Sequence, residues 1–178
     1  MLCSDINYNN PINIEGLCDN LQEVRTTISE FPYWTERVIQ ELVAIPATSP
    51  HISEVNSVNI SINIIRKEVI VTPMASIENI EGKFATGRKL LLEGQLCQII
   101  EYTTVDPYDQ LRTMTVYNPF SAYIVVPKEV DINGELIDSL SVNFDIYSCV
   151  EDLNVNNIDG CRLLKTVSVL FYAIPNNL

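Results

Sequence analysis

The sequence predicts an all-β fold: an antiparallel β-sandwich, or a sandwich that curls like a barrel, with an N-terminal arm that carries a short helix. Three observations support this prediction. Apolar and polar residues alternate over several long stretches, as they do in half-buried strands. Turn signals separate these stretches, and no helical pattern lies between them. Apolar residues make up 47% of the 178 residues, which is enough to bury the core of one domain.

Residues 1–30 differ from the remainder and form the expected arm, and residues 31–178 form the expected sandwich domain. Four apolar side chains of the arm fall near helical spacing, which predicts a short helix from about 18 to 29, before Pro32. These side chains are Leu17, Leu21, Val24 and Ile28. The arm is predicted to be extended over residues 1–16.

The arm also offers a route to assembly. Its first apolar residues alternate with Asn13 and Glu15 in a strand-like patch. Such a segment can add to the open sheet edge of a neighbouring chain. The candidate assembly residues are Ile12, Ile14 and Leu17. Open repetition of one head-to-tail contact of this kind builds a filament.

Six stretches of alternating or continuous apolar residues are the predicted strands. They cover residues 38–45, 58–71, 90–102, 114–126, 140–150 and 167–173. A long loop is predicted over 75–87, and turns are predicted at 106–109, 133–134 and 159–160. Two details of the sequence also predict irregularities in these strands. Pro119 cannot donate a ladder hydrogen bond, so its strand should lie at a sheet edge or carry a bulge. The apolar phase flips after Val150, which predicts a bulge or a new strand.

The charge balance excludes two classes of partner. The chain has 11 basic and 23 acidic residues, for a net charge of -12, and the basic residues form no stripe. Binding to a phosphate backbone or to an anionic membrane surface needs such a stripe. We therefore expect no nucleic acid and no membrane among the partners, and we interpret the acidic surface as a source of solubility.

Nothing in the sequence nominates an active site, so we expect a protein that is not an enzyme. The one histidine, His51, lies in a predicted loop, and a Cys-His or Ser-His pair would have to use it. Residues 82–89 imitate the glycine spacing of a phosphate-binding loop. That loop needs lysine followed by serine or threonine, and then a helix, whereas Arg88 and Lys89 precede a predicted strand. We expect no catalytic residue, no cofactor and no metal site.

The chain has five cysteines, Cys3, Cys18, Cys97, Cys149 and Cys161, and none are spaced as C-x-x-C, which argues against zinc. Their number is odd, so at least one cannot pair within the chain. Cys97 and Cys149 share the polar phase of their strands, and the other three lie in the arm or in a turn. All five are candidates for disulfides between chains. The alternative is inert thiols in a reducing cytosol.

The start of the chain is polar, and it has neither the basic end nor the apolar segment of a secretion signal. No stretch approaches the roughly 18 apolar residues of a membrane span. We therefore expect that the protein stays in the compartment where it is made unless the producing cell lyses around it.

Several strand and turn motifs of the chain resemble those of a known family. They are IP at 45–46, KLLLEGQL at 89–96, IIEY at 99–102, NPFSAYIVVP at 118–127 and VEDLNV at 150–155. The chain from about residue 42 to residue 174 thereby resembles the SPOCS domain of spore-forming Clostridia and their relatives. The resemblance implies a β fold and a role in the spore coat, the exosporium or spore morphogenesis. The family offers no catalytic residues to carry over.

The resemblance and the arm together predict a structural protein that assembles with itself on a spore surface, in the coat, the exosporium or an appendage, after synthesis in the mother-cell cytoplasm. One alternative is an adaptor that binds another spore coat or morphogenetic protein through an exposed sheet edge. Another alternative is a carbohydrate-binding module or hydrolase, which would need an exposed aromatic platform. The aromatic residues available for one are scattered: Trp34, Tyr102, Tyr117, Tyr123 and Tyr147.

Overall fold

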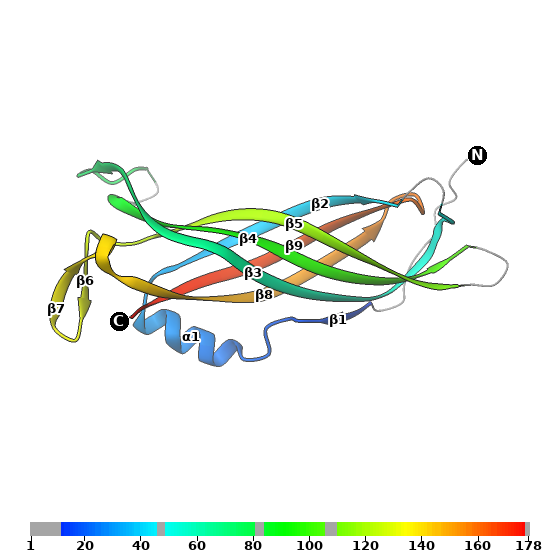
Figure 1. The fold of residues 1–178 in the computed structure, drawn as a ribbon, viewed down its shortest axis with the longest axis horizontal. Helices are drawn as coiled ribbons and strands as arrows, with labels where there is room; N and C mark the ends of the chain where they lie inside the picture. Colours follow the sequence, from blue (N-terminus) through cyan, green and yellow to red (C-terminus); the bar gives the residue numbers. More distant parts are fainter. Residues whose placement is uncertain (1–11, 46–48, 81–83, 106–109, 177–178) are drawn as a thin grey trace.

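The computed structural model describes residues 12–45, 49–80, 84–105 and 110–176, and it confirms the all-β prediction. Two sheets pack face to face in a long, narrow sandwich whose strands run along its length (Figure 1). One α-helix and one short 3-10 helix complete the described secondary structure. The turn predicted at 106–109 lies outside the described residues.

The first sheet has the strand order β1-β3-β4-β5. Its strands are β1 (Asn13–Glu15), β3 (Ile52–Ala75), β4 (Ala85–Thr104) and β5 (Leu111–Val125). The long strands β3, β4 and β5 pair antiparallel in sequence order, whereas the short β1 pairs parallel with β3. The connection between β3 and β4 is shorter than the predicted loop over 75–87, because both ends of that stretch already belong to strands.

The second sheet has the order β2-β9-β8, and its strands are all antiparallel. They are β2 (Trp34–Ala44), β8 (Asn143–Asn157) and β9 (Arg162–Asn176). A small hairpin of β6 (Glu129–Ile132) and β7 (Glu135–Asp138) lies at one end of the sandwich (Figure 1). The 3-10 helix η1 (Ser139–Ser141) then leads into β8.

Several local predictions are confirmed by the strand positions. Pro119 lies on β5, which is an edge strand of the first sheet. The register of β8 against β9 shifts between Val150 and Asp152, at the predicted change of phase. Asn133 and Gly134 close the small hairpin with φ values of 56° and 87°. A two-residue hairpin turn requires such positive values to match the twist of its strands.

Inward side chains of both sheets meet in one core. Leu92 of β4 and Leu163 and Phe171 of β9 have no exposed surface. Gly94 lies among the inward-facing residues of β4 and has no side chain there. The ring of Phe120 from β5 fills the space beside Gly94. This ring also stacks on the ring of Phe171, with the two centroids 5.1 Å apart. Removal of this apolar surface from water is the main stabilising term, at about 25 cal/mol per Å².

The helix α1 (Leu21–Glu30) covers part of the outer face of the second sheet, and it confirms the helix predicted for the arm. Asn20 caps its first turn through a side-chain oxygen that accepts a backbone N–H. Val24 is the buried residue of the helix, and it packs against Cys149 of β8 and Leu170 of β9. The described part of the arm is therefore packed on the sandwich.

Candidate assembly surfaces

The described part of the arm lies against its own domain. The strand β1 pairs with Ser57 to Asn59 of β3, so strand addition to a sheet edge takes place within the chain. The three candidate assembly residues, Ile12, Ile14 and Leu17, are partly buried against the core. Addition of the arm to a neighbouring chain stays a prediction, and it requires these residues to leave the edge that they occupy here.

Gly16 lets the arm approach β3 closely. Its φ is +94°, and a Cβ at this position would lie 2.0 Å from the carbonyl oxygen of Ile60. Glycine is the residue that tolerates both that φ and that approach. Two residues later, the N–H of Cys18 donates to the carbonyl oxygen of Val150 on β8, at 2.9 Å. The arm therefore crosses from the edge of β3 to the edge of β8.

This crossing brings Cys18 beside Cys149, and the two form a disulfide within the chain, with their Cα atoms 5.1 Å apart. The expectation of bonds between chains is corrected for these two cysteines. The expected exposure of Cys149 is also wrong, because α1 covers that side of β8 and leaves the residue 3% exposed. Cys97 and Cys161 are free, half-buried thiols, so a disulfide between chains stays a prediction for them. Cys3 lies outside the described residues.

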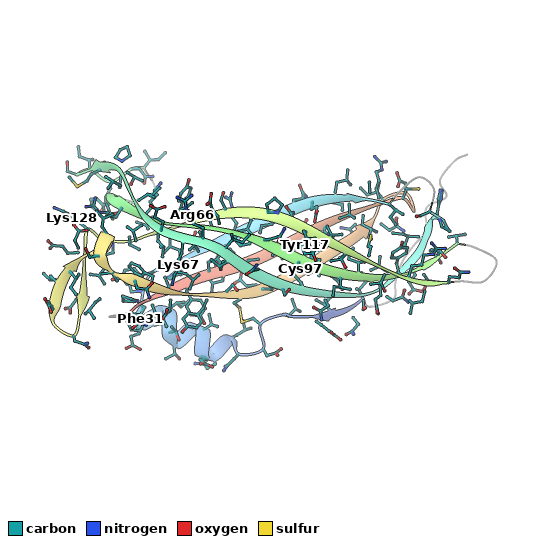
Figure 2. The ribbon with its side chains drawn as sticks, viewed as in Figure 1. Phe31, Arg66, Lys67, Cys97, Tyr117 and Lys128 are labelled. Atoms are coloured by element: carbon teal, nitrogen blue, oxygen red, sulfur yellow. A yellow bond between two sulfur atoms is a disulfide. The ribbon has the colours of Figure 1, made fainter. Side chains whose placement is uncertain are left out.

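The outer face of the β3-β4-β5 sheet is not covered by any described helix (Figure 1), and we call it the uncovered face. Large apolar side chains lie exposed on it, among them Ile99 (41%), Tyr117 (58%), Tyr123 (48%) and Val125 (48%). Cys97 pairs with Tyr117 in the β4-β5 register, and Figure 2 shows the two residues close together. Exposed apolar clusters are typical of surfaces that contact other proteins.

Most charged side chains on the uncovered face have a partner of opposite charge or an aromatic ring. Arg66 forms an ion pair with Glu93 at 3.1 Å and another with Glu68. The Nζ atom of Lys89 lies 5.3 Å from the ring centroid of Tyr123. The whole chain carries a net charge of -12, so most of its surface repels a second copy. The uncovered face repels it less.

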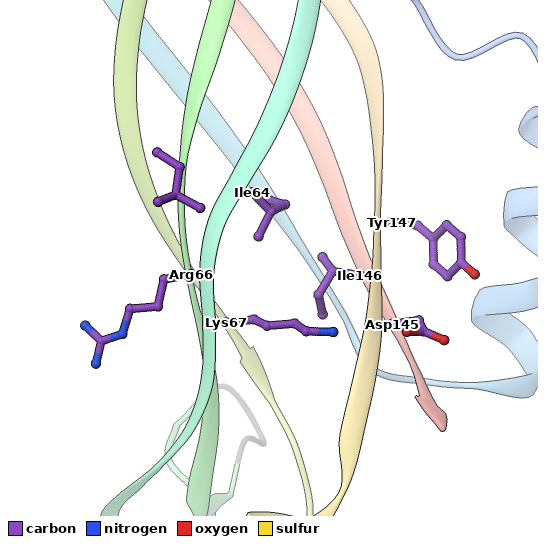
Figure 3. A pocket seen from close by; sticks show the side chains of 7 residues that line it. Ile64, Arg66, Lys67, Asp145, Ile146 and Tyr147 are labelled. Atoms are coloured by element: carbon purple, nitrogen blue, oxygen red, sulfur yellow. The ribbon is translucent and has the colours of Figure 1, made fainter. Parts of the chain in front are cut away.

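An open groove of about 460 Å³ lies between the edges of β3 and β8. It is lined by residues 64–67 of β3 and 145–147 of β8 (Figure 3). Beside it, Nζ of Lys67 donates to the carbonyl oxygen of Phe144 at 2.6 Å and so joins the two edges. The groove belongs to the same seam that the arm crosses at Val150, and open strand edges of this kind accept extended peptides.

A polar cluster lies between the two sheets and consists of Glu41 of β2, Gln98 of β4 and Lys165 of β9. Lys165 is 0% exposed and Gln98 is 1% exposed. Nζ of Lys165 lies 2.7 Å from Oε1 of Gln98 and 2.9 Å from Oε2 of Glu41. Burial lowers the pKa of Lys165, and the Glu41 carboxylate opposes that shift.

This cluster escaped prediction, although its signal is present in the sequence. Lys165 lies two residues before Val167 and therefore shares the inward phase of β9. Gln98 lies on the inward phase of β4, between Leu96 and Ile100. Polar groups are buried at a cost unless they have partners, so a lysine on the apolar phase of a predicted strand points to a partner in the core.

The other sequence-predicted residues do not form a shared site. His51 is exposed. Gly87 lies within β4, so the described part of the glycine-rich stretch is mainly strand, while Gly82 lies outside the described residues. Within the described ranges, no group of three or more His, Cys, Asp or Glu residues could hold a metal ion. The helices described are all too short or too polar to cross a membrane.

The aromatic residues considered for carbohydrate binding are dispersed over the molecule. Tyr102 is buried, Trp34 lies on β2, and Tyr147 stacks on Tyr172 with centroids 5.2 Å apart. The other two lie on the uncovered face but six residues apart on one strand, which is about 20 Å at 3.3 Å per residue. These residues do not form one platform.

None of the family models, curated proteins or solved structures compared with the chain matches it.

Proposed function

We propose that the chain is a non-enzymatic structural protein that assembles with copies of itself in a surface layer or appendage of a bacterial spore. The uncovered face is the observation that carries the self-assembly part of the proposal. Its apolar side chains gather in two areas, one at Ile99 and Tyr117 and one at Tyr123 and Val125. The cross-strand row of Arg66 and Glu93 lies between them.

This pattern suits contact with a second copy. A two-fold axis through the charged middle would bring the Ile99–Tyr117 area of one copy against the Tyr123–Val125 area of the other. Such isologous contacts use the same patch on both subunits and are the commonest contacts in homo-oligomers. The same rotation would bring Arg66 opposite Arg66 and Glu93 opposite Glu93. The ion pair within each copy would reduce the repulsion between these like charges.

An extended assembly needs a second contact besides this face. The arm supplies one if residues 12–30 leave their own domain and dock in the same way on a neighbour. Exchange of an element between identical chains reuses native contacts, so it costs little beyond opening the hinge.

The spore location rests on the resemblance of the strand motifs at 89–96 and 118–127 to the SPOCS family. The free thiols of Cys97 and Cys161 fit a surface layer that is oxidised after release from the mother cell. A coat, exosporium or appendage protein of this kind works by its contacts, and needs no catalytic residue or cofactor.

Sedimentation velocity over a range of concentrations tests the self-assembly proposal. The full chain should form larger species as its concentration rises. The double variant Ile99→Ser/Tyr117→Ser should need at least about tenfold more protein for the same association. Truncation of a central aromatic contact residue such as Tyr117 costs about 2 kcal/mol, and 1.4 kcal/mol is tenfold. The matched control Val38→Ser/Leu42→Ser changes residues of similar exposure on β2 and should associate as the full chain does.

A full chain that sediments as a monomer at every concentration would contradict the proposal. It would favour the second candidate, an adaptor that binds an extended segment of another coat protein. The groove between β3 and β8 is the observation that favours this candidate, since two open strand edges line it. In that case those backbone amides of residues 145–147 that point away from β9 should exchange quickly in the isolated chain and become protected when the partner segment is added.

A further inference from the structure

The polar cluster between the sheets has an arrangement that suits a covalent reaction. Its amine and carboxamide belong to different sheets: Lys165 comes from β9 and Gln98 comes from β4. Both side chains lie in the apolar core, where Leu96, Ile100 and Leu163 have no exposed surface. The reacting groups are therefore kept from water and held in place by the packing of both sheets.

One carboxylate reaches both nitrogen atoms of the cluster. Oε2 of Glu41 lies 2.9 Å from Nζ of Lys165, and it accepts a hydrogen bond from Nε2 of Gln98 at 3.3 Å. Nζ in turn donates to Oε1 of Gln98 at 2.7 Å. An ion pair alone would not require the carboxamide. The three groups together place a nucleophile, an acyl carbon with its leaving group, and a general base within contact of each other.

We propose that Lys165 and Gln98 become joined by an intramolecular isopeptide bond, with Glu41 as the acid and base that carries the protons. The bond would link β9 to β4 and so fasten the two sheets of the sandwich to each other covalently. This inference does not depend on the proposed spore function, because it concerns the chain by itself.

The reaction balances without an oxidant or any other reactant. Glu41 takes a proton from the Lys165 ammonium, and the neutral Nζ attacks the side-chain carbonyl carbon of Gln98. The electron pair of the C=O bond moves to Oε1, and it re-forms the C=O bond when the bond to Nε2 breaks. Glu41 passes one proton from Nζ to Nε2, so the nitrogen leaves as ammonia, and it keeps the second proton from Nζ as a neutral carboxyl group. One C–N bond forms, one breaks, and nothing is oxidised or reduced.

Burial favours the first step of this reaction. Desolvation lowers the pKa of Lys165, so removing a proton to give the neutral, nucleophilic amine costs less free energy. Gln98 is 1% exposed, so water has little access to its carbonyl carbon and hydrolysis of the carboxamide competes little. The product amide is uncharged, and its formation removes a buried ammonium whose desolvation is costly.

The test is the intact mass of the purified full chain, measured after reduction so that the disulfide does not contribute. The folded protein should weigh less than its sequence by the mass of one ammonia, about 17 Da. A peptide digest should yield one branched peptide that contains both Gln98 and Lys165. Loss of ammonia from Asn133–Gly134 to a succinimide gives the same deficit, and the digest separates the two sites.

Three variants complete the test. Glu41→Gln keeps the size of the side chain but removes the base. Lys165→Arg keeps the positive charge but replaces the amine with a guanidinium group, which is not readily acylated. Both should fold and both should have their full sequence mass. Gln95→Leu, on the outward phase of β4, is the matched control and should keep the deficit.

The proposal is overturned by a folded full chain that keeps its sequence mass after days at neutral pH. It is overturned equally by a deficit that maps to Asn133 or that persists in Lys165→Arg. If Glu41→Gln fails to fold, Lys165→Arg and the branched peptide still decide the question.

Discussion

Removing the Cys18–Cys149 disulfide should cost a large part of the stability of the protein. The two cysteines are 131 residues apart in the sequence. Closing a loop of that length removes chain entropy from the unfolded state worth about 5 kcal/mol, with measured losses of roughly 2–5 kcal/mol. The free energy of unfolding of a typical domain is about 5–15 kcal/mol. The substitution Cys18→Ser should therefore lower the urea midpoint strongly and raise the slope of the transition, because the unfolded chain becomes less compact.

The assay is equilibrium unfolding in urea without reductant, followed by the near-ultraviolet signal of the aromatic residues. The matched control is Cys161→Ser, which removes a free thiol and should leave the midpoint unchanged. The unmodified chain with reductant should behave like Cys18→Ser. A Cys18→Ser variant within about 1 kcal/mol of the unmodified, unreduced chain would refute the disulfide as a stabilising link.

Three further changes test other parts of the structure. Gly16→Ala places a Cβ 2.0 Å from a carbonyl oxygen of β3 and should release β1. The amides of residues 57–59 that point to β1, and not those that point to β4, should then exchange faster, and unchanged exchange of those amides would count against the docked arm. Gly94→Ala places a Cβ 2.6 Å from the ring of Phe120 and should cost about 1–3 kcal/mol in urea unfolding, and an unchanged midpoint would contradict this packing. Hydrogen bonding and Arg88 lower the pKa of Asp138, so its stabilising contribution exists above the unfolded value of 3.8 and disappears as pH falls. The stability advantage over Asp138→Asn should therefore shrink on acidification, and an advantage independent of pH would exclude this role.

The strands were predictable because each has one face in the core and one outside it. The alternation over residues 58–64 and 90–102 therefore appears directly in the sequence, and both stretches lie within β3 and β4. The positions of Pro119 and of the bulge after Val150 were equally predictable. Proline has no N–H to donate to a neighbouring strand, and a change of the apolar phase accompanies a shift in register.

The pairings across space were not predictable from the same pattern. Cys149 lies on the polar phase of β8, and only the path of the arm and the cover by α1 make that position buried and bonded. Lys165, Gln98 and Glu41 are 57 or more residues apart in every pair but share one point between the sheets. Periodicity shows which face of its sheet each residue lies on. Which residues of the two sheets meet in the core is decided by how the sheets pack together.

Negative-stain electron microscopy of the purified full chain shows directly whether the protein assembles with itself. The comparison is with Ile99→Ser/Tyr117→Ser, each sample prepared with and without reductant. Self-assembly through the uncovered face predicts ordered fibres or sheets from the full chain and their loss in the double variant, with reductant weakening any assembly that disulfides join. Dispersed single particles in every sample would contradict the claim.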